Sequence, residues 1–164
     1  MNYCGTLIAV RDMERSKRFY CELLGMSVTA NFGANVTLSG GVSLQTLDSW
    51  QGFLQKAREE IVLGHHAAEL YFEEKDMDGF LQKLAAWPGI VYVHPPKEHA
   101  WGQRVVRFYD PDRHVIEVGE DMNMVVRRFL DSGMTPEETA RRMDVPATYI
   151  RQCMEAAGEI PRPS

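Results

Sequence analysis

The feature that most constrains the fold is a pattern that occurs twice, 64 residues apart. In each copy an apolar run leads to an aspartate followed by methionine, at Asp12 and at Asp76, and apolar residues then recur at helical spacing. An aspartate in that place can accept hydrogen bonds from the free amides of a helix's first turn. Gly25 and Gly89 follow the two helical patterns, where a left-handed stop is expected. Such a repeat predicts two copies of one unit that share a core.

Short strand-like runs complete each copy, and glycine-rich or proline-containing turns separate them. The expected strands after the helices are residues 27–30, 34–38 and 42–47 in the first copy, and 90–93, 104–109 and 115–118 in the second, which opens with 69–73. Residues 50–61 are expected to form a polar, helical connector. Each copy therefore has the order β-α-β-β-β; the alternative is two unrelated α+β segments.

Charge and cysteine usage narrow the class of protein. The net charge of −5 gives no general attraction to nucleic acid or to an anionic membrane. The three cysteines are scattered without a C-x-x-C spacing, which is typical of reduced thiols. No run approaches the length of about 20 apolar residues that a spanning helix needs. We expect a cytoplasmic protein without membrane contact.

Alternation along the strands separates an apolar face from a polar one. The apolar face comprises Ile8, Val10, Leu70, Phe72, Val106, Phe108, Ile116 and Val118. The polar face comprises Gln45, Glu69, Tyr71, Glu73, Gln103, Arg107, Tyr109 and Glu117. Burying unpaired charge costs several kcal/mol, so the polar set is not core. It either faces solvent, as in a one-sided sheet, or lines a binding cleft.

Two strings resemble a known family. VRDMERSKRFYCELLGM (Val10–Met26) resembles the opening of vicinal-oxygen-chelate modules, and FYDPDRHVIEV (Phe108–Val118) resembles their closing hairpin. This superfamily contains the glyoxalases, bleomycin resistance proteins and ring-cleaving dioxygenases. The resemblance implies an α+β domain over residues 1–121, with two βαβββ modules whose mixed sheets curl around a ligand cleft. It also implies that the polar face lines that cleft, and that the protein is a homodimer.

The resemblance places four metal-ligand positions on this chain. They fall on Gly5, Gln45, Glu69 and Glu117, so two keep a carboxylate, one has an amide and one has no side chain. Glyoxalase I and extradiol dioxygenase activities are therefore not expected, because both need a complete set of ligands. A site of Glu69, Glu117 and Gln45 would suit a divalent ion such as Mn, Mg, Zn or Ni.

Other polar residues are candidates for chemistry and for ligand contact. His99, Tyr71 and Glu73 are the expected proton-transfer groups, since they combine an imidazole, a phenol and a carboxylate. The expected ligand contacts are Arg107, which could anchor an anionic group, together with Trp101, Gln103 and Tyr109. For Trp101, packing over the end of the barrel is an equal alternative.

The remaining histidines are interpreted as parts of the scaffold. His65 and His66 are adjacent, so at most one could face a cleft, and a solvated loop pair is favoured. His114 has the parity of the apolar face and is interpreted as structural. His94 precedes two prolines and is interpreted as a loop residue.

Residues 122–164 form a helical extension with the rhythm of a helix-turn-helix. Thr135, with proline next and Glu138 three residues on, forms a capping box. Six arginines are balanced by six acidic residues, so the segment lacks the basic surface that DNA phosphates require. A packing or dimerising helical hairpin is favoured over a nucleic-acid partner.

Three functions follow from these features. The first is a divalent-metal-assisted enzyme of the lyase or isomerase type acting on a small oxygenated molecule. The second is a metal-free small-molecule-binding protein of the bleomycin-resistance type. The third is a regulatory module whose helical extension transmits ligand occupancy to a partner or to DNA.

Overall fold

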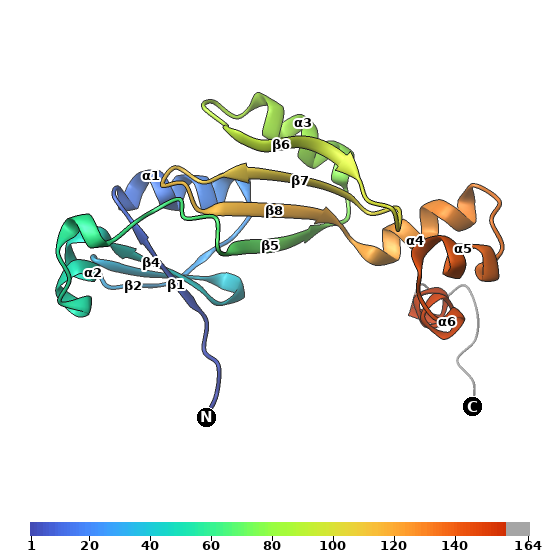
Figure 1. Cartoon of the computed structure of the whole chain (residues 1–164), viewed down its shortest axis with the longest axis horizontal. Helices are drawn as coiled ribbons and strands as arrows, with labels where there is room; N and C mark the ends of the chain where they lie inside the picture. The colour runs from blue at the N-terminus through green and yellow to red at the C-terminus, as the bar shows by residue number, and fades with distance from the viewer. Residues whose placement is uncertain (157–164) are drawn as a thin grey trace. The chain divides into compact units, whose positions relative to one another are not determined.

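The computed structural model describes residues 1–156 and shows an α+β chain with two four-stranded sheets and helices (Figure 1). In order across each sheet, the strands are β1 (Thr6–Val10), β4 (Val42–Thr46), β3 (Asn35–Leu38) and β2 (Val28–Asn31), then β5 (Glu69–Glu74), β8 (Val115–Glu120), β7 (Arg104–Tyr109) and β6 (Tyr92–Glu98). Both sheets place the first strand of a module beside its fourth. The repeated βαβββ unit and the α+β class are therefore confirmed.

The chain divides into two compact units. Among the described residues, 1–70, 82–93 and 108–116 form the first unit, and 71–81, 94–107 and 117–156 form the second. Each of the strands β5 to β8 contributes residues to both units. In the sheet of the first unit β1 pairs with β4 in parallel, whereas β3 runs antiparallel to both β4 and β2.

The first helix of the first unit begins as expected but continues differently. Helix α1 (Met13–Arg18) is capped by Asp12, whose carboxylate accepts from the Arg15 amide at 3.0 Å. The chain then widens into a π-helical turn, η1 (Phe19–Leu23), instead of continuing as an α-helix to residue 24. Gly25 follows with a φ of 72°, the left-handed conformation expected of a helix stop.

The predicted turn between β7 and β8 also anchors this helical segment. The buried Tyr20 hydroxyl donates to Asp110 at 2.8 Å, and Asp110 also accepts from the His114 ring and from two backbone amides. Asp112 is buried and pairs with Arg11 at 3.0 Å. Burial, followed by the nearby Asp110 charge, raises the pKa of Tyr20 well above its ordinary value. The structural role predicted for His114 is confirmed.

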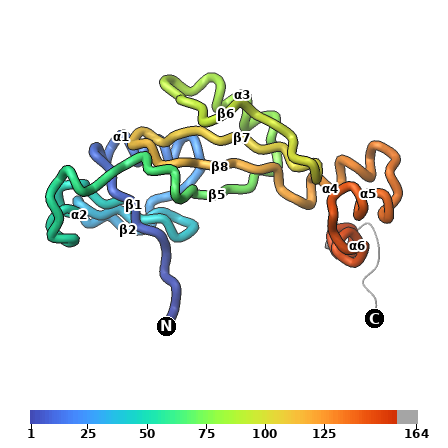
Figure 2. Tube along the Cα trace, viewed as in Figure 1, coloured from blue at the N-terminus to red at the C-terminus, as the bar shows by residue number. Residues whose placement is uncertain are grey.

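Two boundaries differ from the sequence prediction. Strand β6 covers Tyr92–Glu98 rather than 90–93, so His94 is a strand residue and its interpretation as a loop residue was wrong. The prolines after it are tolerated because β6 is an edge strand, where a missing amide donor costs no ladder bond. The helix of the connector, α2 (Leu47–Leu54), starts directly after β4, and a short turn follows at Arg58–Glu60 (Figure 2).

The extension consists of three helices, α4 (Met122–Asp131), α5 (Pro136–Met143) and α6 (Ala147–Ala156). Seven buried residues hold them together, namely Val125, Val126, Phe129, Ala140, Met143, Ile150 and Cys153. The predicted capping box at Thr135 is confirmed, with the Glu138 amide donating to its hydroxyl at 3.2 Å. The remaining helix, α3, covers Met77–Ala86. None of the helices described between residues 1 and 156 is long and apolar enough to span a membrane.

Candidate functional site

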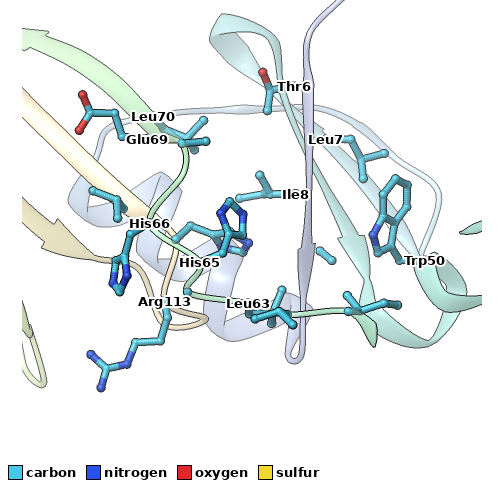
Figure 3. Close-up of a pocket in the computed structure, with 17 residues that line it drawn as sticks. Thr6, Leu7, Ile8, Trp50, Leu63, His65, His66, Glu69, Leu70 and Arg113 are labelled. Carbon is cyan, nitrogen blue, oxygen red and sulfur yellow. The ribbon is translucent and has the colours of Figure 1, made fainter. Parts of the chain in front are cut away.

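A cavity of about 360 Å³ opens within the first unit (Figure 3). Its wall comes from β1, the connector, the start of β5 and the turn before β8. The apolar part of the wall comprises Leu7, Ile8, Trp50, Ile61, Val62, Leu63, Leu70 and Val115, and the polar part includes Thr6, His65, His66, Glu69, Arg113 and His114. This volume lies within the range of roughly 300–1,000 Å³ of small-molecule sites.

The charged side chains at the cavity lie at its edge. Figure 3 shows Ile8, Leu63 and His65 around the hollow, whereas Glu69 and Arg113 point away from it. The Arg113 guanidinium stacks on the Tyr109 ring with 4.9 Å to the ring centroid. His65 accepts from the Ala67 amide through Nδ1 at 3.1 Å, so in the neutral ring the proton is on Nε2. The cavity therefore offers apolar contacts, an indole and an imidazole rather than a cluster of charge.

The pair His65 and His66 is exposed, as predicted for a loop pair, yet both residues line the cavity. His66 has a φ of 58°, and its Nε2 lies 2.7 Å from the Tyr109 hydroxyl. Tyr109, an expected ligand contact, is thereby held next to the cavity by a histidine and an arginine.

Most of the other predicted site residues form a connected cluster in the second unit. Tyr71 donates to Glu73 at 2.9 Å and accepts from the Gln103 amide at 3.0 Å. The Trp101 indole donates to Gln103 at 3.3 Å, and its ring stacks on His99 with centroids 4.2 Å apart. Strand β5 supplies Tyr71 and Glu73, and the turn between β6 and β7 supplies the other three residues.

Two groups of this cluster, His99 and Tyr71, have pKa values shifted toward their neutral forms. Burial, followed by the charges of Lys97, Arg107 and His94, lowers the pKa of His99 below its ordinary value of 6.5. Burial also raises the pKa of Tyr71, although the Gln103 hydrogen bond opposes the shift. At neutral pH His99 is therefore an uncharged base and Tyr71 a protonated phenol.

Two of the three side chains expected to bind metal, Glu117 and Gln45, are engaged in other interactions. The buried Glu117 forms an ion pair with Arg107, which also lies 3.4 Å from His94. The buried Gln45 accepts from Asn35 at 2.8 Å and donates to the hydroxyl of Ser49.

The local backbone explains why the first expected ligand position, Gly5, carries no side chain. Gly5 has a φ of 142°, and a Cβ on it would lie 2.3 Å from the Gly41 carbonyl oxygen. A side-chain ligand cannot be accommodated at this position without moving the neighbouring chain. Within residues 1–156 no group of three or more His, Cys, Asp or Glu could hold a metal ion. The residues present do not fit the divalent metal site of the family.

Sequence reasoning missed the cavity itself. Residues 50–61 were interpreted as a polar connector, although Trp50 at its start and the Ile61-Val62-Leu63 run at and just beyond its end are an apolar signal. That signal was available, but no local pattern indicates which strand such a run will cover.

The chain matches the glyoxalase-like domain family over residues 3–123, and therefore belongs to that family. A protein of unknown function from Agrobacterium tumefaciens is 36% identical, with a TM-score of 0.64 over 74% of this chain and 94% of that chain. The same fold occurs in a glyoxalase-related enzyme from Fulvimarina pelagi, at 17% identity, a TM-score of 0.63 and coverage of 74% and 88%. A lactoylglutathione lyase from Agrobacterium tumefaciens shares it at 20% identity, a TM-score of 0.55 and coverage of 74% and 94%. No curated protein matches the chain.

Proposed function

We propose that this protein is a metal-independent small-molecule-binding member of the glyoxalase-like family. The observation that carries the proposal is the cavity of about 360 Å³ beside β1, whose wall is largely apolar and contains the Trp50 indole. Apolar and aromatic walls with a few polar groups are typical of sites for small organic ligands.

The wall also indicates the class of ligand. Ile8, Leu63 and Trp50 favour a flat apolar or aromatic body, since Trp offers a large rigid contact surface. His65 supplies one hydrogen-bond donor, and Glu69 points away from the hollow. A cavity of about 150 Å³ is enough for benzene, so one of this size suits a two-ring molecule. We infer an uncharged aromatic ligand with one hydrogen-bond acceptor.

Two of the expected metal ligands, Glu117 and Gln45, already have other partners, which supports metal independence. If a metal ion replaced Arg107 as the partner of Glu117, the Arg107 guanidinium would lose this carboxylate. Such a loss is costly in a half-buried site. Gln45 would bind a cation through its amide oxygen, and that oxygen already accepts a hydrogen bond from Asn35 of the adjacent strand.

A metal-assisted lyase or isomerase is the second candidate. The observation in its favour is that Glu69, one of the expected ligands, is part of the cavity wall with two histidines nearby.

Ligand-observed NMR and metal analysis separate the two candidates. We expect 2-naphthol to bind, and 2-naphthoate and 2-naphthylmethylamine to bind more weakly. Trp50→Ala should weaken naphthol binding about tenfold. Phe53→Ala is the matched control, because Phe53 lies on the same helix, is 69% exposed and is not part of the cavity wall.

Two outcomes would contradict the proposal. Absence of binding by all three probes, or equal weakening by both variants, would show that the cavity is not the site. Uptake of one equivalent of Mn, Mg, Zn or Ni that Glu69→Ala abolishes would instead establish the metal-assisted candidate.

A further inference from the structure

The turn between β6 and β7 carries three of the predicted site residues, His99, Trp101 and Gln103. The His99 amide donates to the Gln103 carbonyl and the Gly102 amide to the His99 carbonyl, both at 2.9 Å. His99 and Trp101 stack nearly parallel, at 12°. Trp101 is 38% exposed, so burial alone does not hold this stack.

A charged contact ties this turn to helix α4. Arg128 donates to the Gly102 carbonyl oxygen and lies 3.5 Å from Glu98, and so contacts both ends of the turn. The same guanidinium pairs with the buried Glu120 at 3.2 Å, which fixes its orientation. Arg142 of α5 adds a second ion pair to Glu98, at 3.3 Å.

An apolar contact seats the same helix against the turn. The ring of Phe129 lies so close to Gly102 that a Cβ on this glycine would be 2.2 Å from the Phe129 Cζ atom. Gly102 has a φ of 91°, so the position requires glycine for its conformation as well. The guanidinium carbons of Arg128 and Arg142 lie 5.1 and 5.5 Å from the centroid of the same ring.

Arg128, Phe129 and Arg142 all lie beyond residue 123, where the match to the family ends. We propose that helices α4 and α5 are a latch on the turn Glu98–Gln103, in which Arg128 and Phe129 are positioning residues that hold the His99–Trp101 stack. The inference assigns a role to the extension that needs neither DNA nor a partner chain. It does not depend on the ligand proposed for the cavity, because its effect is measured without ligand.

The test compares two neighbouring arginines of α4. Arg128→Ala removes the contacts to the turn, whereas Arg127→Ala is the matched control, because Arg127 is 58% exposed and pairs only weakly with Asp131 at 3.8 Å. Trp101 is observed alone after Trp50→Phe and Trp87→Phe. We expect Arg128→Ala to raise acrylamide quenching of Trp101 about twofold, as for a segment released from its local contacts.

The pKa of His99 gives a second readout in the chain with all three tryptophans. Because burial is the main cause of its lowered pKa, release of the turn should move that pKa up toward 6.5 in an NMR titration. Glu98→Gln removes the ion pairs to both arginines while leaving Arg128 on Glu120, and it should produce a smaller shift in the same direction.

Circular dichroism shows whether the helices of the extension remain folded in Arg128→Ala. If Arg128→Ala unfolds the extension, Glu98→Gln provides the test in a folded chain. The latch is refuted if a folded Arg128→Ala variant, or Glu98→Gln, shows the same quenching of Trp101 and the same pKa of His99 as the control Arg127→Ala.

Discussion

Removing the hydroxyl of Tyr20 tests which interactions stabilise the first unit. Tyr20 is completely buried and donates to the buried Asp110 at 2.8 Å. Tyr20→Phe leaves the ring and its packing in place and removes only this donor. A hydrogen bond to a charged group contributes about 1.5–3 kcal/mol. Asp110 keeps its other donors, so we expect a loss near the lower end, about 2 kcal/mol.

Urea denaturation followed by the fluorescence of Trp50 and Trp87 measures this loss in the first unit, which contains both residues. At about 2–4 °C per kcal/mol, the melting temperature should fall by roughly 4–8 °C. Tyr3→Phe is the control: Tyr3 is 84% exposed, and its hydroxyl contacts only Thr6, at 2.6 Å. Its effect should stay within about 0.5 kcal/mol.

The same hydroxyl predicts a pH dependence. The pKa of Tyr20 in the folded protein lies above the ordinary value of 10.0. The stabilisation is therefore fully present below pH 10 and is lost as the pH rises toward the folded-state pKa. The parent protein should lose stability above pH 10 more steeply than Tyr20→Phe. Equal stability of Tyr20→Phe and Tyr3→Phe at pH 7, or parallel losses above pH 10, would refute this reasoning.

Three further predictions concern the backbone, the ion pairs and the extension. Gly5→Ala should cost about 2 kcal/mol or more in urea denaturation, because its Cβ would meet the Gly41 carbonyl, whereas Gly33→Ala, with open space around it, should cost only about 1 kcal/mol. Burial opposes ionisation of Glu120, but its two arginine partners outweigh it and lower its pKa. The parent protein should thus lose stability in acid titrations as the pH falls below 4.5, and Glu120→Gln should lack this part of the loss. Thr135→Ala removes a cap and should lower helix stability by about 1 kcal/mol in thermal melts followed by circular dichroism; no change would contradict the capping box.

The fold was predictable because several local rules agree along the chain. Asp12 is a helix cap, Gly25 is a left-handed stop, and the apolar parity of β7 and β8 corresponds to buried Phe108 and Ile116. The π-helical turn and the full extent of β6 were not predictable. Both depend on packing against neighbours distant in sequence, and an edge strand tolerates prolines that would exclude a central one.

The candidate site was less predictable, because parity gives the face of a strand residue but not its partner. Alternation placed Glu117 and Arg107 on one polar face, and the structure pairs them with each other. It also grouped Gln45 with the carboxylates, although its amide is used by Asn35 of the adjacent strand and by Ser49. Counting possible donors therefore overestimates metal sites wherever neighbouring strands carry groups that satisfy them.

Gly5 and Gly102 are both approached closely by a neighbouring group, but the consequences differ. At Gly5 the close approach of Gly41 leaves no room for the ligand that a metal centre would need. At Gly102 the close approach of Phe129 leaves no room for a side chain, but here the approaching ring belongs to the helical extension. A side chain at either position would be strained by its positive φ as well as blocked by its neighbour. Gly5 precedes β1 at a position without room for a metal-binding side chain, and Gly102 lets Phe129 of the extension pack against the turn that carries His99 and Trp101.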